Sequence, residues 1–225
     1  MIKIENVDVF GWEAAVRGMR NPMNSWDKSD STFTDVFEDY EFHDYYMKCA
    51  DIGENDLKLM KSLVKAGSDH SKFMRMINVT CDITAPLYFW KEFDTYKVGT
   101  VRNSCSTMHK IAEKEFTLED FSHEHLTNET LIKLKEVINY LNISRDCFIS
   151  DRTRKDYWWQ MIQLLPSSYN QKATVQLNYA VLRNMYHGRK NHKLDEWRED
   201  FCRFVESLPY SELITCGFDD EKKEG

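Results

Sequence analysis

The clearest pattern of apolar and polar positions lies in residues 127–141, TNETLIKLKEVINYL, where apolar side chains recur every three or four residues. This spacing predicts an amphipathic helix capped by Thr127 or Asn128. Residues 154–166, RKDYWWQMIQLLP, predict a second helix ended by Pro166. Residues 173–190 and 193–208 predict two more helices, which complete a mainly helical C-terminal half.

The N-terminal half contains segments with the alternating pattern of a strand and segments with the three-to-four-residue spacing of a helix. Residues 2–10 alternate and predict a short strand, and residues 11–20 predict a helix that stops near Pro22. Residues 54–67 place apolar side chains on one helical face, with Gly67 closing the helix. Residues 76–83, MINVTCDI, alternate as a half-buried strand does. Residues 24–46 are polar and aromatic, and their pattern favours no element.

Pro86 suits the first turn of a helix, which we expect to carry the unusual stretch from Phe89 to Lys110, FWKEFDTYKVGTVRNSCSTMHK. No repeat, linker or composition shift interrupts the chain. The pattern therefore predicts one α+β domain over residues 1–218, mainly helical with a small sheet. Residues 219–225 are expected to form a charged tail.

Composition narrows the function classes. The chain has 225 residues, 13% of them aromatic, and a net charge of -7, which makes a general nucleic-acid binder improbable. Its six cysteines form no C-x-x-C pair, and no run approaches the length of a membrane helix. The start of the chain lacks the apolar core of a signal peptide. We therefore expect a cytoplasmic protein with reduced thiols that binds neither nucleic acid nor membrane.

Two candidate sites, the run His123–His125 and Cys105, each have an ordinary structural explanation. Both Gly-x-Gly-x-x-Gly and the phosphate loop ending in Gly-Lys-Ser/Thr are absent. The His123-Glu124-His125 run has no further ligand at metal spacing, so a solvated segment before a helix is favoured. Cys105, one helical turn before His109, has the spacing of an activated nucleophile, but a small packing cysteine is favoured.

Residues 173–190 carry a basic face. Asn178 and Arg189 are eleven residues apart, so on one helix they share a face and lie about 16 Å apart along its axis. That span suits the two ends of a long ligand, or two stacked ligands. The alternative is a solvated basic face to which Arg183, His187 and Lys190 contribute.

An ordered set of motifs connects these segments. Residues 165–197 contain, in order, Leu165-Pro166, Asn178, Asn184, Arg189, His192 and Trp197. Upstream are AAVRGMR in residues 14–20, HSKFMR in residues 70–75, which includes Ser71, and APLYFW in residues 85–90. Taken together, these motifs resemble those of flavin-dependent thymidylate synthases along most of the chain. The resemblance implies the fold of that family and a homotetramer whose sites are shared between subunits.

The family signature, Arg-His-Arg-x-x-Ser-x-Asn-Glu-x-Ser-x-Arg-Tyr, falls on the stretch from Phe89 to Lys110 and is altered there. Its first triplet becomes Thr95-Tyr96-Lys97 or Tyr96-Lys97-Val98. Asn103 and Ser106 match, whereas Ser104 replaces Glu, Met108 replaces Arg and His109 replaces Tyr. Earlier in the chain, Pro22 or Met23 replaces a small hydroxyl residue, and Met74 replaces a Glu.

The resemblance implies a divergent enzyme of nucleotide biosynthesis, a flavoprotein methyltransferase that methylates C5 of dUMP or a related pyrimidine nucleotide. Methylenetetrahydrofolate would supply the carbon, and FAD reduced by NADPH would supply the hydride. The implied substrate-binding residues are Lys97, Arg102, Ser104, Ser106 and Arg189. The implied flavin-binding residues are Ser71, Tyr96, Lys97, Asn103, Asn178 and Asn184. No catalytic residue and no metal ligand is assigned. The lost signature residues favour an alternative, a non-catalytic relative that binds nucleotide or flavin, or serves in assembly.

Overall fold

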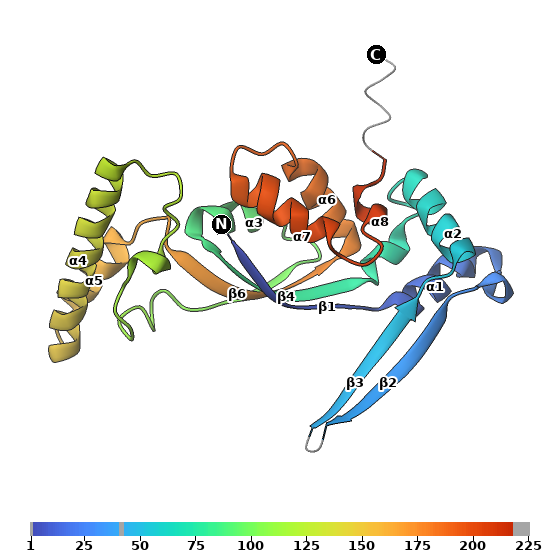
Figure 1. Ribbon diagram of the computed structural model, residues 1–225, viewed down its shortest axis with the longest axis horizontal. Helices are drawn as coiled ribbons and strands as arrows, with labels where there is room; N and C mark the ends of the chain where they lie inside the picture. Colours follow the sequence, from blue (N-terminus) through green and yellow to red (C-terminus); the bar gives the residue numbers. More distant parts are fainter. Residues whose placement is uncertain (1, 41–42, 218–225) are drawn as a thin grey trace, which may run out of the picture. The chain divides into compact units, whose positions relative to one another are not determined.

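Four strands of the computed structural model form one sheet, in the order β1-β4-β6-β5 (Figure 1). The structure describes residues 2–40 and 43–217, so the expected charged tail lies outside the described residues. The strands are β1 (Lys3–Phe10), β4 (Asn78–Pro86), β5 (Val101–Ser104) and β6 (Asn170–Asn178). The expected α+β class with a small sheet is confirmed.

The alternation predicted for β4 is present. Ile77, Val79, Cys81 and Ile83 are buried, whereas the residues between them are partly exposed. β6 shows the same period, with Ala173, Val175 and Leu177 buried and their neighbours exposed. The helix predicted over residues 173–190 was therefore wrong in its first third, because an alternating segment forms a strand once sheet partners flank it.

The chain divides into two compact units, and all four strands of the sheet continue from one unit into the other. Unit 1 comprises Met1–Glu5, Asp82–Thr95 and Arg102–Val175, and unit 2 comprises Asn6–Cys81, Tyr96–Val101 and Gln176–Gly225. Because the two units share these strands, the predicted single domain over residues 1–218 stays a prediction.

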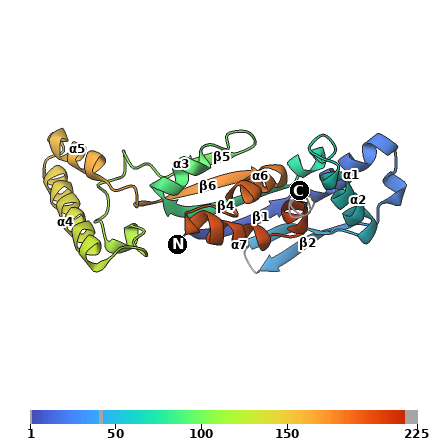
Figure 2. The same ribbon diagram turned by 90° about the horizontal axis from the view of Figure 1, so that it is seen from above.

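Unit 1 is built around a helical hairpin of α4 (Asn128–Ser150) and α5 (Lys155–Leu164), which lie side by side in Figures 1 and 2. Thr127 is the helix cap, its hydroxyl accepting from the Thr130 amide at 3.4 Å. Below the hairpin lies an apolar core of Ile111, Ala112, Phe116, Phe121, Leu134, Ile138, Leu141 and Met161. The remaining helices of unit 1 are α3 (Leu87–Phe93) and the short η4 (Leu118–Asp120).

The stretch from Phe89 to Lys110 is not one helix as expected. α3 ends at Phe93, turns follow, and β5 takes up Val101–Ser104. Phe89, Trp90 and Phe93 fill the core and bury the first turns. Gly99 has φ +79°, which a helix does not allow, so the chain leaves the helix before that point.

Unit 2 contains α1 (Trp12–Arg20), α2 (Glu54–Lys65) and α6 (Tyr179–Arg189), followed by η5 (Glu196–Phe201), α7 (Cys202–Glu206) and α8 (Glu212–Thr215). α1 and α2 match their predictions, and α6 and α7 lie on one face of the strands (Figures 1 and 2). η5 is a π-helical turn within the predicted last helix. Short helical turns complete the unit: η1 (Asn21–Met23), η2 (Trp26–Lys28) and η3 (Lys72–Arg75).

Residues 24–46, which sequence periodicity left unassigned, contribute to a hairpin. β2 (Thr32–Tyr40) pairs antiparallel with β3 (His43–Asp51), beginning at the pair Thr32 and Asp51. Before the hairpin, the loop of residues 24–31 is held by a buried ion pair between Arg20 and Asp56, at 2.6 Å. Among the described helices, none has the length and apolar character needed to cross a membrane.

Candidate functional site

Arg189, the last residue of α6, lies against two neighbouring aromatic rings in unit 2. Its guanidinium carbon is 5.3 Å from the ring centres of both Tyr96 and Trp197. Its Nε donates a hydrogen bond of 3.0 Å to the Tyr96 hydroxyl. A guanidinium stacked in this way is held in a fixed orientation. Because a guanidinium is weakly hydrated, stacking it on a ring removes little favourable hydration. The structure therefore brings together two predicted site residues that are 93 positions apart in sequence.

Asn178 caps the start of α6. Its side-chain oxygen accepts from the Val181 amide at 3.0 Å, as a helix cap does. A Cβ placed on Gly99 would lie 2.8 Å from the Asn178 Nδ2, so the turn of residues 96–101 passes directly over the cap. Asn178 thus has a structural role that its predicted contact to flavin did not include.

Three other predicted residues, Lys97, Asn184 and Ser71, also belong to unit 2. Lys97 and Asn184 are exposed, which leaves their polar ends accessible. Ser71 donates its hydroxyl hydrogen bond to the Gly67 carbonyl at 3.0 Å and so closes the turn after α2. Because the side chains of Lys97 and Asn184 are exposed, a ligand can reach them.

Arg102 of unit 1 is engaged by the protein itself. It pairs with Asp94 at 3.0 Å, approaches Gln171 at 3.5 Å and stacks over Trp90 at 4.9 Å. Its predicted substrate contact would have to compete with that aspartate. The structural role follows from Asp94, which sequence reasoning did not consider as a partner.

Residues 103–106 follow the edge strand β5. Asn103 is exposed and Ser104 is half-buried. The Ser106 hydroxyl accepts from the amides of Met108 and His109, at 3.2 and 3.0 Å, and so shapes the turn that follows. Ser106 therefore stabilises its own loop.

The interpretation of Cys105 as a packing residue was wrong, since this cysteine is exposed. It lines a cavity of about 340 Å³ in unit 1, together with Ser106, Tyr169 and Lys172. Burial, together with the nearby Asp120 carboxylate, raises the pKa of Tyr169, so its phenol stays protonated at neutral pH. Cys105 directly follows β5, the last strand in the order of the sheet.

The His123–His125 run also lies in unit 1. His125 is exposed, and the His123 Nδ1 lies 2.7 Å from the Phe121 carbonyl. Within residues 2–40 and 43–217, no three His, Cys, Asp or Glu side chains gather as a metal site requires.

Sequence reasoning missed the partners that position these residues. Trp197 belonged to the matched motif, but its contact with Arg189 was not foreseen. Gly99 carried the one available signal, because a glycine inside a presumed helix suggests a turn. No sequence pattern indicated the partners of Arg102. Its contacts with Trp90, Asp94 and Gln171 join residues of separate elements.

Solved structures resemble this chain over nearly its whole length. Thymidylate synthase X (ThyX) from Helicobacter pylori, solved with FAD and dUMP, matches at a TM-score of 0.65 with 15% identity, covering 99% of this chain and 100% of the other. The chain has a ThyX-like fold. A second structure of that enzyme, also with FAD and dUMP, has a TM-score of 0.64 with 15% identity, covering 94% of this chain and 96% of the other.

A UMP/dUMP methylase, PolB from Streptomyces cacaoi, bound with 5-Br dUMP, has a TM-score of 0.56 at 13% identity and covers 92% of this chain and 88% of its own. No protein-family model and no curated protein matches the sequence. The expected resemblance to ThyX therefore holds at the level of the fold. The ThyX-like fold extends over both units, including the strands that they share.

Proposed function

We propose that this protein is a divergent flavin-dependent enzyme that methylates C5 of dUMP or a related pyrimidine nucleotide. The observation that carries the proposal is the full-length agreement with a ThyX structure that holds FAD and dUMP. The neighbouring methylase structure, bound to 5-Br dUMP, supports a pyrimidine nucleotide as substrate. Methylenetetrahydrofolate as carbon donor and NADPH as reductant complete the proposal, together with a homotetramer.

The chemistry of the side chains around the end of α6 suits a flavin and a nucleotide. Arg189 and the exposed Lys97 supply positive charge, and Asn184 offers both a donor and an acceptor. Tyr96 sets the orientation of Arg189. When bound, reduced FAD would supply the hydride for the methyl group.

In this proposal, Arg189 and Lys97 bind the nucleotide and neutralise charge on its phosphate or ring. Lys97 is a point charge on a flexible stem, whereas the family's arginines present a planar fork. We therefore expect the nucleotide to be oriented mainly by Arg189, whose own orientation is fixed by Tyr96 and Trp197. The implied ligand contacts of Tyr96 and Lys97, and those of Asn103, Ser104 and Ser106, stay part of the proposal.

A second candidate is a non-catalytic relative that binds nucleotide or flavin. The structural engagement of Arg102 by Asp94 and of Asn178 by α6 favours it, because two of the implied ligand contacts are already occupied. Ser104 in place of the signature glutamate favours it as well.

Purified protein distinguishes the two. It should bind FAD, seen as absorbance near 450 nm that stays with the protein on gel filtration, and should bind dUMP in calorimetry. With NADPH and methylenetetrahydrofolate it should convert dUMP to a product heavier by one methyl group in mass spectrometry. Binding without product would favour the non-catalytic relative. Absence of both FAD and pyrimidine nucleotide binding would reject both candidates.

A further inference from the structure

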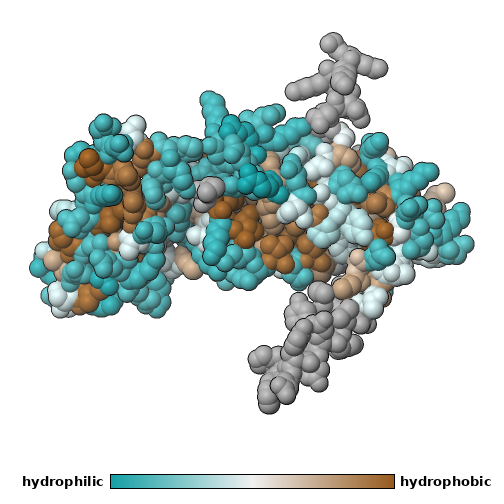
Figure 3. Space-filling view, viewed as in Figure 1, coloured by the Kyte–Doolittle hydropathy of each residue, from teal (hydrophilic) through white to brown (hydrophobic). Residues whose placement is uncertain are grey.

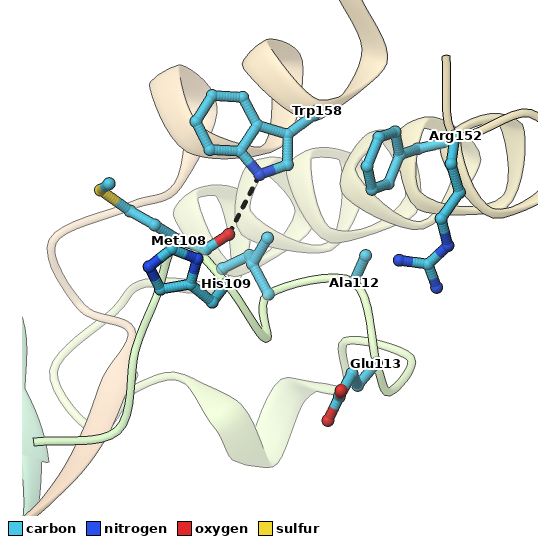
Figure 4. A pocket seen from close by; sticks show the side chains of 8 residues that line it. Met108, His109, Ala112, Glu113, Arg152 and Trp158 are labelled. Carbon is cyan, nitrogen blue, oxygen red and sulfur yellow. Dashed lines mark hydrogen bonds between the residues drawn. The ribbon is translucent and has the colours of Figure 1, made fainter. Parts of the chain in front are cut away.

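A second cavity of unit 1, of about 250 Å³, lies between the segment after β5 and the α4–α5 hairpin (Figure 4). Its apolar lining comes from Ile111, Ala112, Phe148 and Trp158. Arg152, in the loop between α4 and α5, lines the same cavity. Met108, His109 and Glu113 complete the lining, and apolar walls with a few convergent polar groups are typical of small-molecule sites.

Arg152 differs from the other arginines of unit 1. Three of the four pair with an aspartate: Arg102 at 3.0 Å, Arg145 at 2.7 Å and Arg154 at 2.8 Å. Arg152 instead lies over the Phe148 ring at 5.5 Å, and within the described part of the chain no carboxylate reaches it. In a chain with a net charge of -7, an arginine left without a carboxylate beside a cavity points to an anionic ligand.

Trp158 provides a fixed aromatic wall. Its indole N–H donates to the Met108 carbonyl at 3.1 Å, which sets the ring orientation (Figure 4). A second ring contact, edge-to-face with Trp159 at 4.8 Å, supports it from the outside. When an aromatic ligand packs against Trp158, this side chain loses little conformational freedom, because its orientation is already fixed.

Glu113 also lines the cavity, but its charge is already matched. Its carboxylate pairs with Lys110, and 57% of its side chain is exposed. Figure 4 shows the guanidinium of Arg152 turned toward Ala112, while the Glu113 carboxylate lies below it. The positive end of the cavity is therefore the Arg152 end.

We propose that this cavity binds a small aromatic carboxylate, with its ring against Trp158 and Phe148 and its carboxylate on Arg152. A nucleotide fits less well, because its base and sugar carry many polar groups and the apolar walls offer them few partners. The proposal concerns unit 1 alone and does not rest on the proposed function.

The test uses full-length protein labelled with 5-fluorotryptophan. The protein has six tryptophans, and each labelled tryptophan gives its own ¹⁹F resonance. The variant Trp158→Phe assigns the resonance of Trp158. The matched probes are 4-aminobenzoate and 4-aminobenzamide, which share a ring but differ in charge. We expect 4-aminobenzoate to shift the Trp158 resonance and to bind at least tenfold more tightly than the amide. Trp26, exposed in unit 2, serves as the unshifted internal control.

Arg152→Gln should abolish the preference for the acid, whereas Arg154→Gln should retain it, because Arg154 pairs with Asp156 outside the cavity. Equal binding of acid and amide, a Trp158 resonance that does not respond, or the same loss in both arginine variants would overturn the proposal. So would dUMP shifting Trp158 and displacing 4-aminobenzoate, since the cavity would then belong to the nucleotide.

Discussion

At the scale of single residues, the charged side chains fall into two groups. Arg102 and Arg183 are engaged by the protein: Arg102 by Asp94, and Arg183 by the Ile214 carbonyl at 3.0 Å. Arg189 contacts the rings of Tyr96 and Trp197, which help to fix the orientation of its guanidinium. A basic face read from sequence therefore contains residues of different roles, and the partner of each one decides which role it has.

Arg189→Ala should weaken dUMP binding by about 2 kcal/mol, the value expected for a lost hydrogen bond to a charged group. Calorimetric titration with dUMP measures this loss. Arg203→Ala is the matched control, since the Arg203 side chain on α7 is 73% exposed. Unchanged dUMP affinity in a folded Arg189→Ala protein would contradict the role assigned to Arg189.

Asp56 is a buried carboxylate of unit 2 that accepts hydrogen bonds from Arg20, Ser29 and Ser31. Burial raises the pKa of Asp56, but hydrogen bonds from Ser29, Ser31 and Arg20 outweigh burial and leave the pKa below its usual value. A carboxyl group with a lowered folded-state pKa stabilises the protein above its unfolded pKa of about 4. That stability is lost as the pH falls through the folded-state pKa.

Asp56→Asn should therefore lower the free energy of unfolding at pH 7 by about 3–5 kcal/mol, because it leaves Arg20 buried without its counter-ion. It should also flatten the decline in stability below about pH 4. Urea denaturation from pH 7 to pH 3 measures both effects. Asp27→Asn, an exposed carboxylate of the same loop, should change little. Equal effects of the two substitutions would argue against this account of the loop.

At the scale of elements, the turn of residues 96–101 and the start of α6 depend on each other. Gly99 has a positive φ and lies against the side chain that caps α6. The turn also places Tyr96 against Arg189 at the other end of the same helix. The turn therefore positions both ends of α6, which carries three of the predicted site residues, Asn178, Asn184 and Arg189.

Gly99→Ala should destabilise the protein by more than Gly67→Ala. Both glycines have positive φ, at +79° and +105°, so both variants incur backbone strain of about 1 kcal/mol. Only at Gly99 does the new methyl group also meet Asn178, since nothing lies within 4 Å of a Cβ at Gly67. Thermal unfolding compares the two variants. In an Asn178→Ala background the extra cost at Gly99 should shrink, and an unchanged cost would show that the cap is not involved.

At the scale of the whole molecule, apolar side chains remain on the outer surface of the hairpin. Figure 3 shows apolar side chains gathered over α4 and α5, and the exposed ones include Ile132, Ile143, Ile149 and Trp159. The inner face of α4 packs Leu134, Ile138 and Leu141 into the core. Apolar positions on both sides of one helix are typical of a helix that has a further partner.

The proposed homotetramer predicts a particle of about four times the 26.8 kDa of one chain. Light scattering on gel-filtered protein at micromolar concentration measures this mass. Association should persist at high salt, because the hairpin exposes apolar side chains such as Ile132, Ile143 and Trp159 and screening does not weaken apolar contacts. A mass of one chain under these conditions would contradict the homotetramer.

The sequence by itself determined the elements that have one strong period and a clear end signal. α1, α2, α4, α5 and β4 each bury one face against a core, so local pattern and final environment agree. The ordered motifs along the chain pointed to the fold that the solved structures share. Arg189 lies in a helix as predicted, whereas Asn178, predicted inside the same helix, is the last residue of β6 and caps α6.

Tertiary structure decided the rest, because the deciding contacts join distant parts of the chain. β6 became a strand only beside β4 and β5, and the hairpin of β2 and β3 depends on pairing that no local period shows. Arg102 pairs with Asp94, and Cys105, which follows the edge strand β5, is exposed. Whether a side chain binds a ligand or stabilises the protein depends on which partners fall within a few ångströms, and folding alone brings those partners together.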